Sequence, residues 1–512
     1  MRLADTLLDL PPDRLGTTAW IDRNPDSSLR RCWTWHEITA LTASTASFLQ
    51  DHFVRPGDRV VNIGSNSLAW AILDVACSAI NAVHVPIDPR FSMLEQANCI
   101  EIVNPTLIFS DTASFRSDLE LAQLISLPQT KRLLNQLAVP FDPNDVANIL
   151  FTSGTTGNHR GVMLSHRNLI SNANAKLDAM PQMHQDLRLN FLPFAHAYAR
   201  TCELTTWLIS QSCMEVASGI NDVLRIASIS EPTLINGVPV FYKRLATEWS
   251  RFGSSRSSLS EILGTRIRRL ASGGASLSDE LRTRFAKVEL PIFQGYGLTE
   301  SSPVVCSNRS ASDLEQRDDL IEVGPPVKGM KVRIDENSRL WVSGEGVMLG
   351  YWDNPEASRA KMVGAWLDTG DVAEYADDSS PNCGERSVRI LGRADDTIVL
   401  STGYKIQPLP IEQIIEAQPW VSQCLLLGTN HPFPIILLKL AAAEKNSIAS
   451  EERFVEIQRL LSAFPRHAIP RKLILVAKNW SAENGLANFK GGLIRNRIEK
   501  QLRDEIEEAY RS

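Results

Sequence analysis

The feature that most constrains the fold is a strand–helix–strand pattern near the start of the chain. Arg59 to Ile63 is a short run rich in β-branched residues, Leu68 to Ala82 has the apolar spacing of a helix, and His84 to Ile87 is a second short run. A crossover of this kind favours a parallel or mixed sheet covered by helices. The pattern predicts an α/β fold, and similar runs recur at residues 106–109, 233–236 and 267–271.

The length of 512 residues requires more than one ordinary core, since domains commonly contain roughly 150 residues. After a polar loop at 376–387 and the sequence Gly392-Arg393-Ala394-Asp395-Asp396, the composition restarts as a compact α+β pattern. We expect a large N-terminal domain of packed α/β sheets with a β-rich subregion, residues 1–394, and a small α+β C-terminal domain, residues 395–512. The chain should end on one helix, with an ion pair available between Arg495 and Glu499 and one face lined by Ile494, Ile498, Leu502 and Ile506.

Charge and composition exclude several classes of function. The chain has 53 Lys and Arg against 59 Asp and Glu, a formal net charge of −6, and no dense basic stripe, which argues against binding to nucleic acid. Its 43% hydrophobic and 22% charged residues are typical of globular domains. The eight cysteines form no C-x-x-C pair, which favours a reducing compartment.

No segment has the pattern of a membrane span or a secretion signal. The N-terminal residues interleave charges with apolar residues, and the most apolar long window, Ala69 to Ile87, contains Asp74, Asn81 and His84. We interpret that window as a buried helix that leads into a strand. The expected location is the cytoplasm, and peripheral contact with a membrane stays open.

The segment from Thr152 to Val162 has the residue types of a phosphate-binding loop. An apolar strand leads into a stretch with three glycines, four hydroxyl residues and the cation Arg160. Glycines let backbone N–H groups approach phosphate oxygens, hydroxyls add donors, and Arg160 adds charge. The Walker pattern is absent, because His159 and Val162 stand where it requires Gly-Lys. Taken alone, such a loop is also compatible with a surface turn.

The loop resembles the signature T-S-G-T-T-G-x-P-K-G-V of the acyl-adenylate-forming superfamily, which includes acyl-CoA synthetases. His159 replaces the usual Pro and Arg160 replaces the usual Lys, and Arg presents a planar fork instead of a point charge. The resemblance implies that the loop binds ATP phosphates, with Thr155 also near Mg²⁺. The residues that it assigns to the nucleotide are Thr152, Ser153, Gly154, Thr155, Thr156, Gly157 and Arg160.

Further blocks in the family's order extend the resemblance over most of the chain. In Gln294 to Ser301, the family pattern implies that Tyr296 packs on adenine, Thr299 contacts phosphate and Glu300 holds Mg²⁺. Asp371 would bind both ribose hydroxyls, Arg393 would also reach ribose, and Asp395 would be the hinge of a mobile C-terminal domain that brings in the loop at Gly403. The remaining implied nucleotide contacts are Gly273, Gly274, Ala275, Gln294, Gly295 and Gly297.

Three shorter blocks are similar to those of long-chain fatty acid–CoA ligases. They are Leu192 to Arg200, Gly297 to Pro303 and Pro408 to Glu412, whereas Gly403-Tyr404-Lys405 departs from the subgroup's Gly-Glu-Asn. Within this resemblance His196 would lie beside the acyl carboxylate. The alternative is a core histidine on an aromatic strand with Phe194 and Tyr198.

The family mechanism implies ATP-dependent formation of an acyl-adenylate, with Mg²⁺, followed by transfer of the acyl group to the thiol of CoA. The family's C-terminal Lys, which bridges carboxylate and α-phosphate, is displaced here, because Lys490 lies two or three residues early. Either Lys490 reaches the site through its flexible glycines, or the cation is missing and adenylation is slower on the order of 10²–10³-fold.

Two other functions stay open. The acyl group, from a fatty acid or another carboxylic acid, could pass to the phosphopantetheine of a carrier protein instead of CoA. The chain could also be a nucleotide-binding homologue with weak or no ligase activity, as the departures at His159, Arg160 and Lys490 allow.

Overall fold

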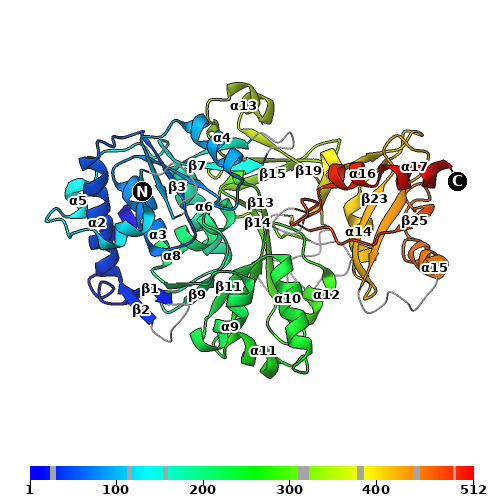
Figure 1. Cartoon of the computed structure of the whole chain (residues 1–512), viewed down its shortest axis with the longest axis horizontal. Coiled ribbons are helices and arrows are strands. Elements are labelled where there is room, and N and C mark those ends of the chain that lie inside the picture. Colours follow the sequence, from blue (N-terminus) through cyan, green and yellow to red (C-terminus); the bar gives the residue numbers. More distant parts are fainter. Residues whose placement is uncertain are drawn as a thin grey trace.

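The computed structural model describes residues 1–23, 30–111, 118–153, 159–309, 322–376, 386–441, 450–481, 483–487 and 492–511, without the side chains of Ser153, Asp279 and Ser450. Figure 1 shows a large N-terminal part that contains most of the chain and a smaller C-terminal part at its side. The N-terminal part contains two large mixed sheets. This arrangement confirms the predicted α/β class with a separate C-terminal domain.

The first sheet contains the predicted strand–helix–strand unit. Strands β3 and β4 are parallel and are joined by helix α3, which is buried along its whole length. The sheet order is β17 (Gly350–Tyr351), β8 (His159–Ser165), β7 (Val146–Ser153), β4 (Val83–Ile87), β3 (Arg59–Ile63), β5 (Leu107–Ser110) and β6 (Leu119–Glu120).

The second sheet is parallel in its centre and antiparallel at both edges. Its order is β14 (Val304–Ser307), β13 (Ile292–Gly297), β12 (Arg269–Ser272), β11 (Leu234–Gly237), β9 (Leu187–Asn190), β10 (Cys213–Val216), β1 (Thr18–Arg23) and β2 (Arg30–Thr34). In parallel sheets of this type, ligands bind beyond the carboxyl ends of the strands.

Helices pack between and around the two sheets. Helix α6 contacts β8 of the first sheet and β14 of the second, and Figure 1 shows α3, α6 and α8 between them. The helices and turns of this part are α1 (Asp5–Leu8), α2 (Trp35–Asp51), α3 (Leu68–Ala79), α4 (Met93–Val103), η1 (Leu121–Ser126), α5 (Leu134–Leu137), α6 (His166–Ala179), α7 (Ala197–Ala199), the π-helix η2 (Arg200–Thr205), α8 (Thr206–Ser210), α9 (Ile220–Ser230), α10 (Pro239–Ser250), α11 (Arg256–Leu263), α12 (Asp279–Ala286) and η3 (Thr299–Ser301).

A β-rich subregion links the N-terminal sheets to the C-terminal part. It consists of β15 (Met330–Ile334), β16 (Arg339–Gly344), α13 (Pro355–Lys361), β18 (Met362–Val363), β19 (Trp366–Tyr375) and β20 (Val388–Arg393). The C-terminal part follows with η5 (Ala394–Asp396), β21 (Ile398–Val399), β22 (Lys405–Ile406), α14 (Pro408–Glu416), β23 (Val421–Leu427), β24 (Ile435–Leu440), α15 (Ser450–Leu460), β25 (Lys472–Leu475), α16 (Arg495–Gln501) and α17 (Arg503–Arg511).

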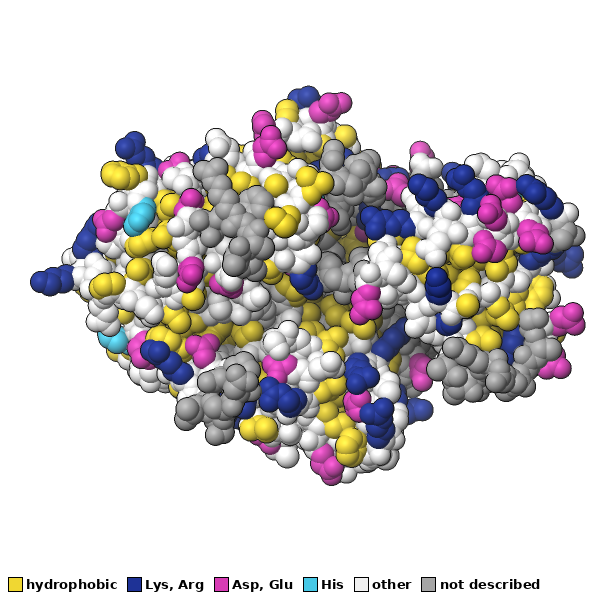
Figure 2. Space-filling model, in the orientation of Figure 1, with side chains coloured by type: hydrophobic (Ala, Val, Ile, Leu, Met, Phe, Trp, Pro, Cys, Tyr) yellow, Lys and Arg dark blue, Asp and Glu magenta, His cyan; other side chains and the backbone are white. Residues whose placement is uncertain are grey.

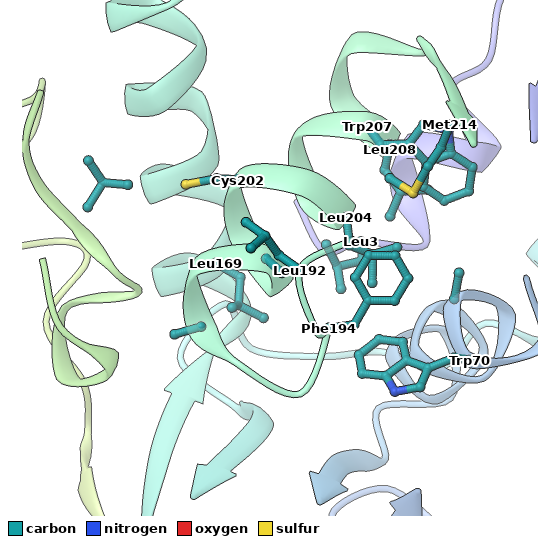
Figure 3. Close-up of a cluster of buried hydrophobic side chains, with 14 of the residues drawn as sticks. Leu3, Trp70, Leu169, Leu192, Phe194, Cys202, Leu204, Trp207, Leu208 and Met214 are labelled. Carbon is teal, nitrogen blue, oxygen red and sulfur yellow. The ribbon is translucent and has the colours of Figure 1, made fainter. Parts of the chain in front are cut away.

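The interior consists of separate apolar clusters in the two parts. One large cluster extends from Leu3 to Val388, and two clusters of the C-terminal part lie wholly within residues 398–506. Figure 3 shows a section of the large cluster, in which Phe194 and Trp70 lie 5.3 Å apart between ring centroids. Burial of such rings is the main favourable term in folding.

The apolar window from Ala69 to Ile87 is a buried helix and strand, as predicted, and its polar residues are paired. Asp74 accepts a hydrogen bond from His84 Nδ1 at 2.8 Å and forms an ion pair of 2.7 Å with Arg200 of η2. All three side chains are buried. Among the described helices, none is long and apolar enough to cross a membrane.

Three local predictions were wrong. The helix after Leu68 ends at Ala79, and the C-terminal helix is broken at Leu502 into α16 and α17. Arg495 pairs with Glu412 of α14 at 2.8 Å instead of with Glu499, because this buried carboxylate competes better than an exposed one for a guanidinium.

Charged side chains of both signs are interspersed over the face seen in Figure 2. Figure 2 shows Lys and Arg beside Asp and Glu across the visible face of both parts. This mixture agrees with the near-balanced sequence charge.

Candidate active site

The predicted ribose carboxylate, Asp371, lies at a contact between three blocks that are far apart in the sequence. Asp371 of β19 is opposite Arg393 of β20 in the sheet register, and Arg393 Nη1 donates to Asp371 Oδ1 at 2.9 Å. The hydroxyl of Tyr296, in β13, donates to the other oxygen, Oδ2. Burial raises the pKa of the Asp371 carboxyl above its ordinary value, although the charge of Arg393 and the Tyr296 hydroxyl act in the opposite direction.

The turn before Asp371 is shaped by Thr369 and Gly370. Thr369 Oγ1 accepts from the Asp371 backbone N–H at 3.0 Å and donates to the Leu340 carbonyl at 2.7 Å. Gly370 has a φ of +77°, and a Cβ atom there would lie 2.9 Å from Arg393 Nη2. The positive φ therefore favours glycine at this position, and a Cβ atom would displace the end of the Arg393 side chain.

A second cluster surrounds the predicted metal carboxylate, Glu300. Thr299 and Glu300 lie in the short turn η3 directly after β13, and the Tyr351 hydroxyl donates to Glu300 Oε1 at 2.8 Å. The guanidinium carbon of Arg160 lies 5.5 Å from the centroid of the Tyr351 ring. The cation of the predicted phosphate loop and the metal carboxylate are thus joined through one buried phenol.

The glycine of Tyr296-Gly297 is fixed by a close approach of two chain segments. A Cβ atom on Gly297 would lie 1.7 Å from the Pro303 carbonyl oxygen, which no side chain could tolerate. Leu298 N–H donates to that same carbonyl at 3.1 Å. Glycine is therefore required between Tyr296 and the turn that contains Glu300.

The predicted phosphate loop is described only at its two ends. Thr152 in β7 pairs with Arg160 in β8, and the two strands run antiparallel. Gly154, Thr155, Thr156 and Gly157 lie outside the described residues, as does the side chain of Ser153. His159, which departs from the family's Pro, stacks on Phe91 at 4.5 Å between ring centroids.

The predicted adenine-flanking turn, Gly273-Gly274-Ala275, follows β12 at the carboxyl end of that strand. Gly274 has a φ of +78°. A Cβ atom on Gly273 would lie 2.9 Å from Cζ of Tyr198, so the phenol ring lies directly on this glycine.

Gln294 and Gly295 bring polar groups to the end of the neighbouring strand, β13. The Gln294 backbone is held by Asn308, whose side chain accepts from Gln294 N–H at 2.9 Å. Within the described part of the chain, Gln294 Oε1 is buried and has no hydrogen-bond partner. A Cβ atom on Gly295 would lie 3.5 Å from the Cys306 carbonyl oxygen, an ordinary contact distance.

His196 belongs to a polar cluster at the carboxyl end of β4. Its Nε2 atom lies 2.8 Å from Asp88 Oδ2 and 3.1 Å from Arg90 Nη2. Burial alone would raise the pKa of Asp88, but hydrogen bonds from His196 and Arg90 hold it well below its ordinary value. The alternative of a histidine on an aromatic strand is wrong, because His196 precedes helix α7 and is partly exposed.

One predicted residue that the structure describes, Gly403, is not joined to the clusters above. Gly403 lies in the turn between β21 and β22, where a Cβ atom would meet nothing within 4 Å. Lys490 falls outside the described residues, between Ala487 and Leu493, which form an isolated β-bridge.

Sequence reasoning missed Tyr351, Asp88 and Arg90. Asp88 and Arg90 directly follow the buried strand β4, and a polar pair after such a strand is a usable signal in an α/β fold. Tyr351 has no such signal, because its two-residue strand reaches the site only through pairing with β8.

Comparison with known proteins is consistent along the chain. Residues 15–352 match the family described as AMP-binding enzyme, and residues 395–512 match the AMP-binding enzyme C-terminal domain. The long-chain-fatty-acid–CoA ligase FadD15 of Mycobacterium bovis is 27% identical over 473 residues, which cover 78% of this chain and 76% of the relative. The feruloyl-CoA synthase of an Amycolatopsis species is 28% identical over 422 residues, 78% of this chain and 81% of the relative.

Among solved structures, ATP-bound MatB from Rhodopseudomonas palustris superposes with a TM-score of 0.81 at 21% identity. The superposition covers 98% of this chain and 99% of MatB. The likeness establishes a shared fold over nearly the whole length.

Proposed function

Because the chain belongs to the AMP-binding enzyme family and is therefore an adenylate-forming ligase of the acid–CoA superfamily, we propose that it joins a long-chain fatty acid to CoA at the expense of ATP. The observation that carries this proposal is the meeting of Asp371, Arg393 and Tyr296 from three separate blocks. Two domains, at 1–394 and 395–512, are part of the same proposal.

Asp371 is suited to bind the ribose of ATP. Its oxygens accept from Arg393 and Tyr296, and two ribose hydroxyls are donors of the same kind. The Tyr296 ring and the turn at Gly273 to Ala275 would then enclose the adenine, with Gln294, Gly295 and Gly297 in the adjacent backbone. Each of these positions is a nucleotide contact in the proposal.

The first reaction is adenylation. A carboxylate oxygen of the acid attacks the α-phosphorus of ATP, the bond to the bridging oxygen breaks, and pyrophosphate leaves with the electron pair. Arg160, Thr299 and the loop from Thr152 to Gly157 supply donors for the charge on the leaving group. His196 lies beside the acid, and Lys490 is assigned to the carboxylate and the α-phosphate.

The donor set around Glu300 fits Mg²⁺. This ion takes one or two carboxylates together with substrate phosphates, and Glu300 is a half-buried carboxylate with one oxygen already oriented by Tyr351. Glu300 and Thr155 would hold the ion. When bound, it neutralises negative charge on the triphosphate.

The second reaction transfers the acyl group to a thiol. The sulfur of CoA attacks the acyl carbon, the bond from that carbon to the phosphate oxygen breaks, and AMP leaves with the electron pair while the thiol proton passes to solvent. Residues 395–512 match a separate family model and have their own apolar clusters, which supports a rotation of the C-terminal domain about Asp395 between the two reactions.

The identities of the carboxylic acid and of the thiol acceptor are the most specific parts of the proposal. The block from Leu192 to Arg200 and the relative FadD15 favour a long-chain fatty acid, and the feruloyl-CoA synthase favours an aromatic acid as the second candidate. CoA is the proposed acceptor, and a carrier-protein phosphopantetheine is its alternative.

The test is release of AMP and pyrophosphate from ATP and Mg²⁺ with acids of graded chain length, ferulate, and either CoA or a holo carrier protein. The proposal predicts AMP release with long-chain acids and CoA. AMP release only with ferulate would reassign the acid, and AMP release only with the carrier protein would reassign the acceptor. Binding of ATP by calorimetry without turnover on any acid would identify a nucleotide-binding homologue instead.

A further inference from the structure

The contacts of Tyr351 suggest a role beyond packing. Its hydroxyl donates to Glu300 Oε1 at 2.8 Å, and the guanidinium carbon of Arg160 lies 5.5 Å from the centroid of its ring. Tyr351 is only 3% exposed. A single buried phenol therefore contacts both a cation and a carboxylate that belong to the candidate active site.

The backbone fixes this phenol in place. Strand β17 pairs with β8, so that Tyr351 lies opposite Val162, two residues after Arg160. On either side, Trp352 N–H donates to the Gly161 carbonyl at 2.7 Å and Leu349 N–H donates to the Met163 carbonyl at 3.0 Å. Strand pairing thus holds the Tyr351 ring beside Arg160.

Glu300 is restrained from the same segment. Met348 N–H donates to the Glu300 carbonyl at 2.9 Å, so the chain from Met348 to Tyr351 contacts both the backbone and the side chain of Glu300. The Tyr351 hydroxyl donates to one oxygen of the Glu300 carboxylate and thereby restrains the orientation of the whole carboxylate group. Groups that orient a metal ligand in this way commonly change metal affinity about 10–100-fold when they are removed.

We propose that Tyr351 is a positioning residue that orients Glu300 toward Mg²⁺ and holds Arg160 at a fixed place beside it. This inference rests on the proposed function, because Glu300 binds Mg²⁺ only in that account.

The test is binding of α,β-methylene-ATP to the full chain by calorimetry, with Mg²⁺ and with EDTA. The ratio of the two dissociation constants measures the metal's contribution without any turnover. Tyr351→Phe should lose about tenfold of that ratio, with affinity in EDTA nearly unchanged. A ratio equal to that of the unmodified chain would overturn the proposal.

Tyr375→Phe is a matched control, because Tyr375 also has an Arg over its ring, Arg386 at 4.8 Å, and donates to a backbone carbonyl at 3.4 Å. It should keep the full ratio. Thermal midpoints of both variants, measured alongside, check that each variant is folded at the temperature of the binding measurement. A loss of the ratio in Tyr375→Phe as large as in Tyr351→Phe would contradict a specific role of Tyr351.

Glu300→Gln separates this inference from the proposed function. In a Glu300→Gln background, Tyr351→Phe should cause no further loss, since its effect acts through the carboxylate. Additive losses would overturn the inference alone. If the unmodified chain and Glu300→Gln show the same ratio, Mg²⁺ binding by Glu300 is wrong and the inference falls with it.

Discussion

Two ionic clusters in this molecule have similar composition and opposite environments. The Asp74 cluster, with His84 and Arg200, is fully enclosed, and the Arg200 side chain is 0% exposed. In the second cluster, Asp371 forms an ion pair with Arg393, whose side chain is 44% exposed, and accepts a hydrogen bond from Tyr296. A fully enclosed ionic cluster holds helices and strands together, whereas the hydrogen-bond partners of a partly exposed cluster can be replaced by polar groups of a ligand.

The sequence positions of the clusters agree with this difference. Asp74 and His84 lie within one apolar window, and Arg200 reaches them from η2, so the cluster connects the first sheet with the segment that follows His196. Tyr296, Asp371 and Arg393 come from blocks that resemble a nucleotide-binding family. The comparison predicts that the first cluster governs stability and the second governs binding.

The largest expected effect is on stability, from Asp74→Ala. Removing one partner leaves Arg200 charged and enclosed, which should lower the free energy of unfolding by about 3–5 kcal/mol. Urea denaturation of the variant measures this loss. Glu507→Ala, which breaks an exposed pair with Arg511, serves as the reference and should cost less than about 1 kcal/mol. Equal losses in the two variants would contradict the comparison.

The enclosed region should also make the fold sensitive to acid through His166. Burial, followed by the charge of Arg2, lowers the pKa of His166 to about 4. The unfolded chain then binds a proton at higher pH than the folded one, so stability falls as the pH drops from about 6.5 to about 4, by roughly 3 kcal/mol in total. His166→Gln should flatten this part of the stability profile, and an unchanged slope would refute the assignment.

At the open cluster, Asp371→Asn should impair ATP use and leave the fold intact. Loss of the ribose acceptor should lower kcat/KM for ATP on the order of 10²-fold, since hydrogen bonds to charged groups contribute about 1.5–3 kcal/mol each. Steady-state kinetics measures the loss of ATP use, and urea denaturation of the same preparation checks that the fold is intact. A variant that unfolds as easily as Asp74→Ala while keeping its ATP kinetics would invert the comparison.

The smallest expected effect concerns Asp88, which is buried like Asp74 but faces His196. Asp88→Asn keeps the shape and removes the charge that holds His196, so KM for the acid should rise about tenfold with KM for ATP unchanged. His196→Ala should produce the same split between the two substrates. A rise in KM for ATP alone would show that the pair serves the nucleotide instead.

Much of the fold was predictable because its signals are local. The strand at Arg59 to Ile63 and the helix from Leu68 are visible as apolar periodicity, and the structure places both within three residues of the prediction. The break at Leu502 was not predictable, since the isoleucine spacing continues across it. Arg495 pairs with Glu412, which is 83 residues away in the sequence, and no local sequence pattern predicts such a contact.

The candidate site divides in the same way. Asp371, Arg393 and Tyr296 were predicted from blocks of contiguous residues, and the structure brings them together. Tyr351 was not predicted, because its place beside Glu300 and Arg160 arises from strand pairing between β8 and β17.

The most direct test of the central claim is exchange of labelled pyrophosphate into ATP, with Mg²⁺ and a carboxylic acid but no CoA. Adenylation is reversible, so a ligase of this family should exchange label only when its acid is present, and Asp371→Asn should lose most of the exchange. Exchange without any acid, or none with any acid while ATP still binds, would contradict an acid-activating enzyme.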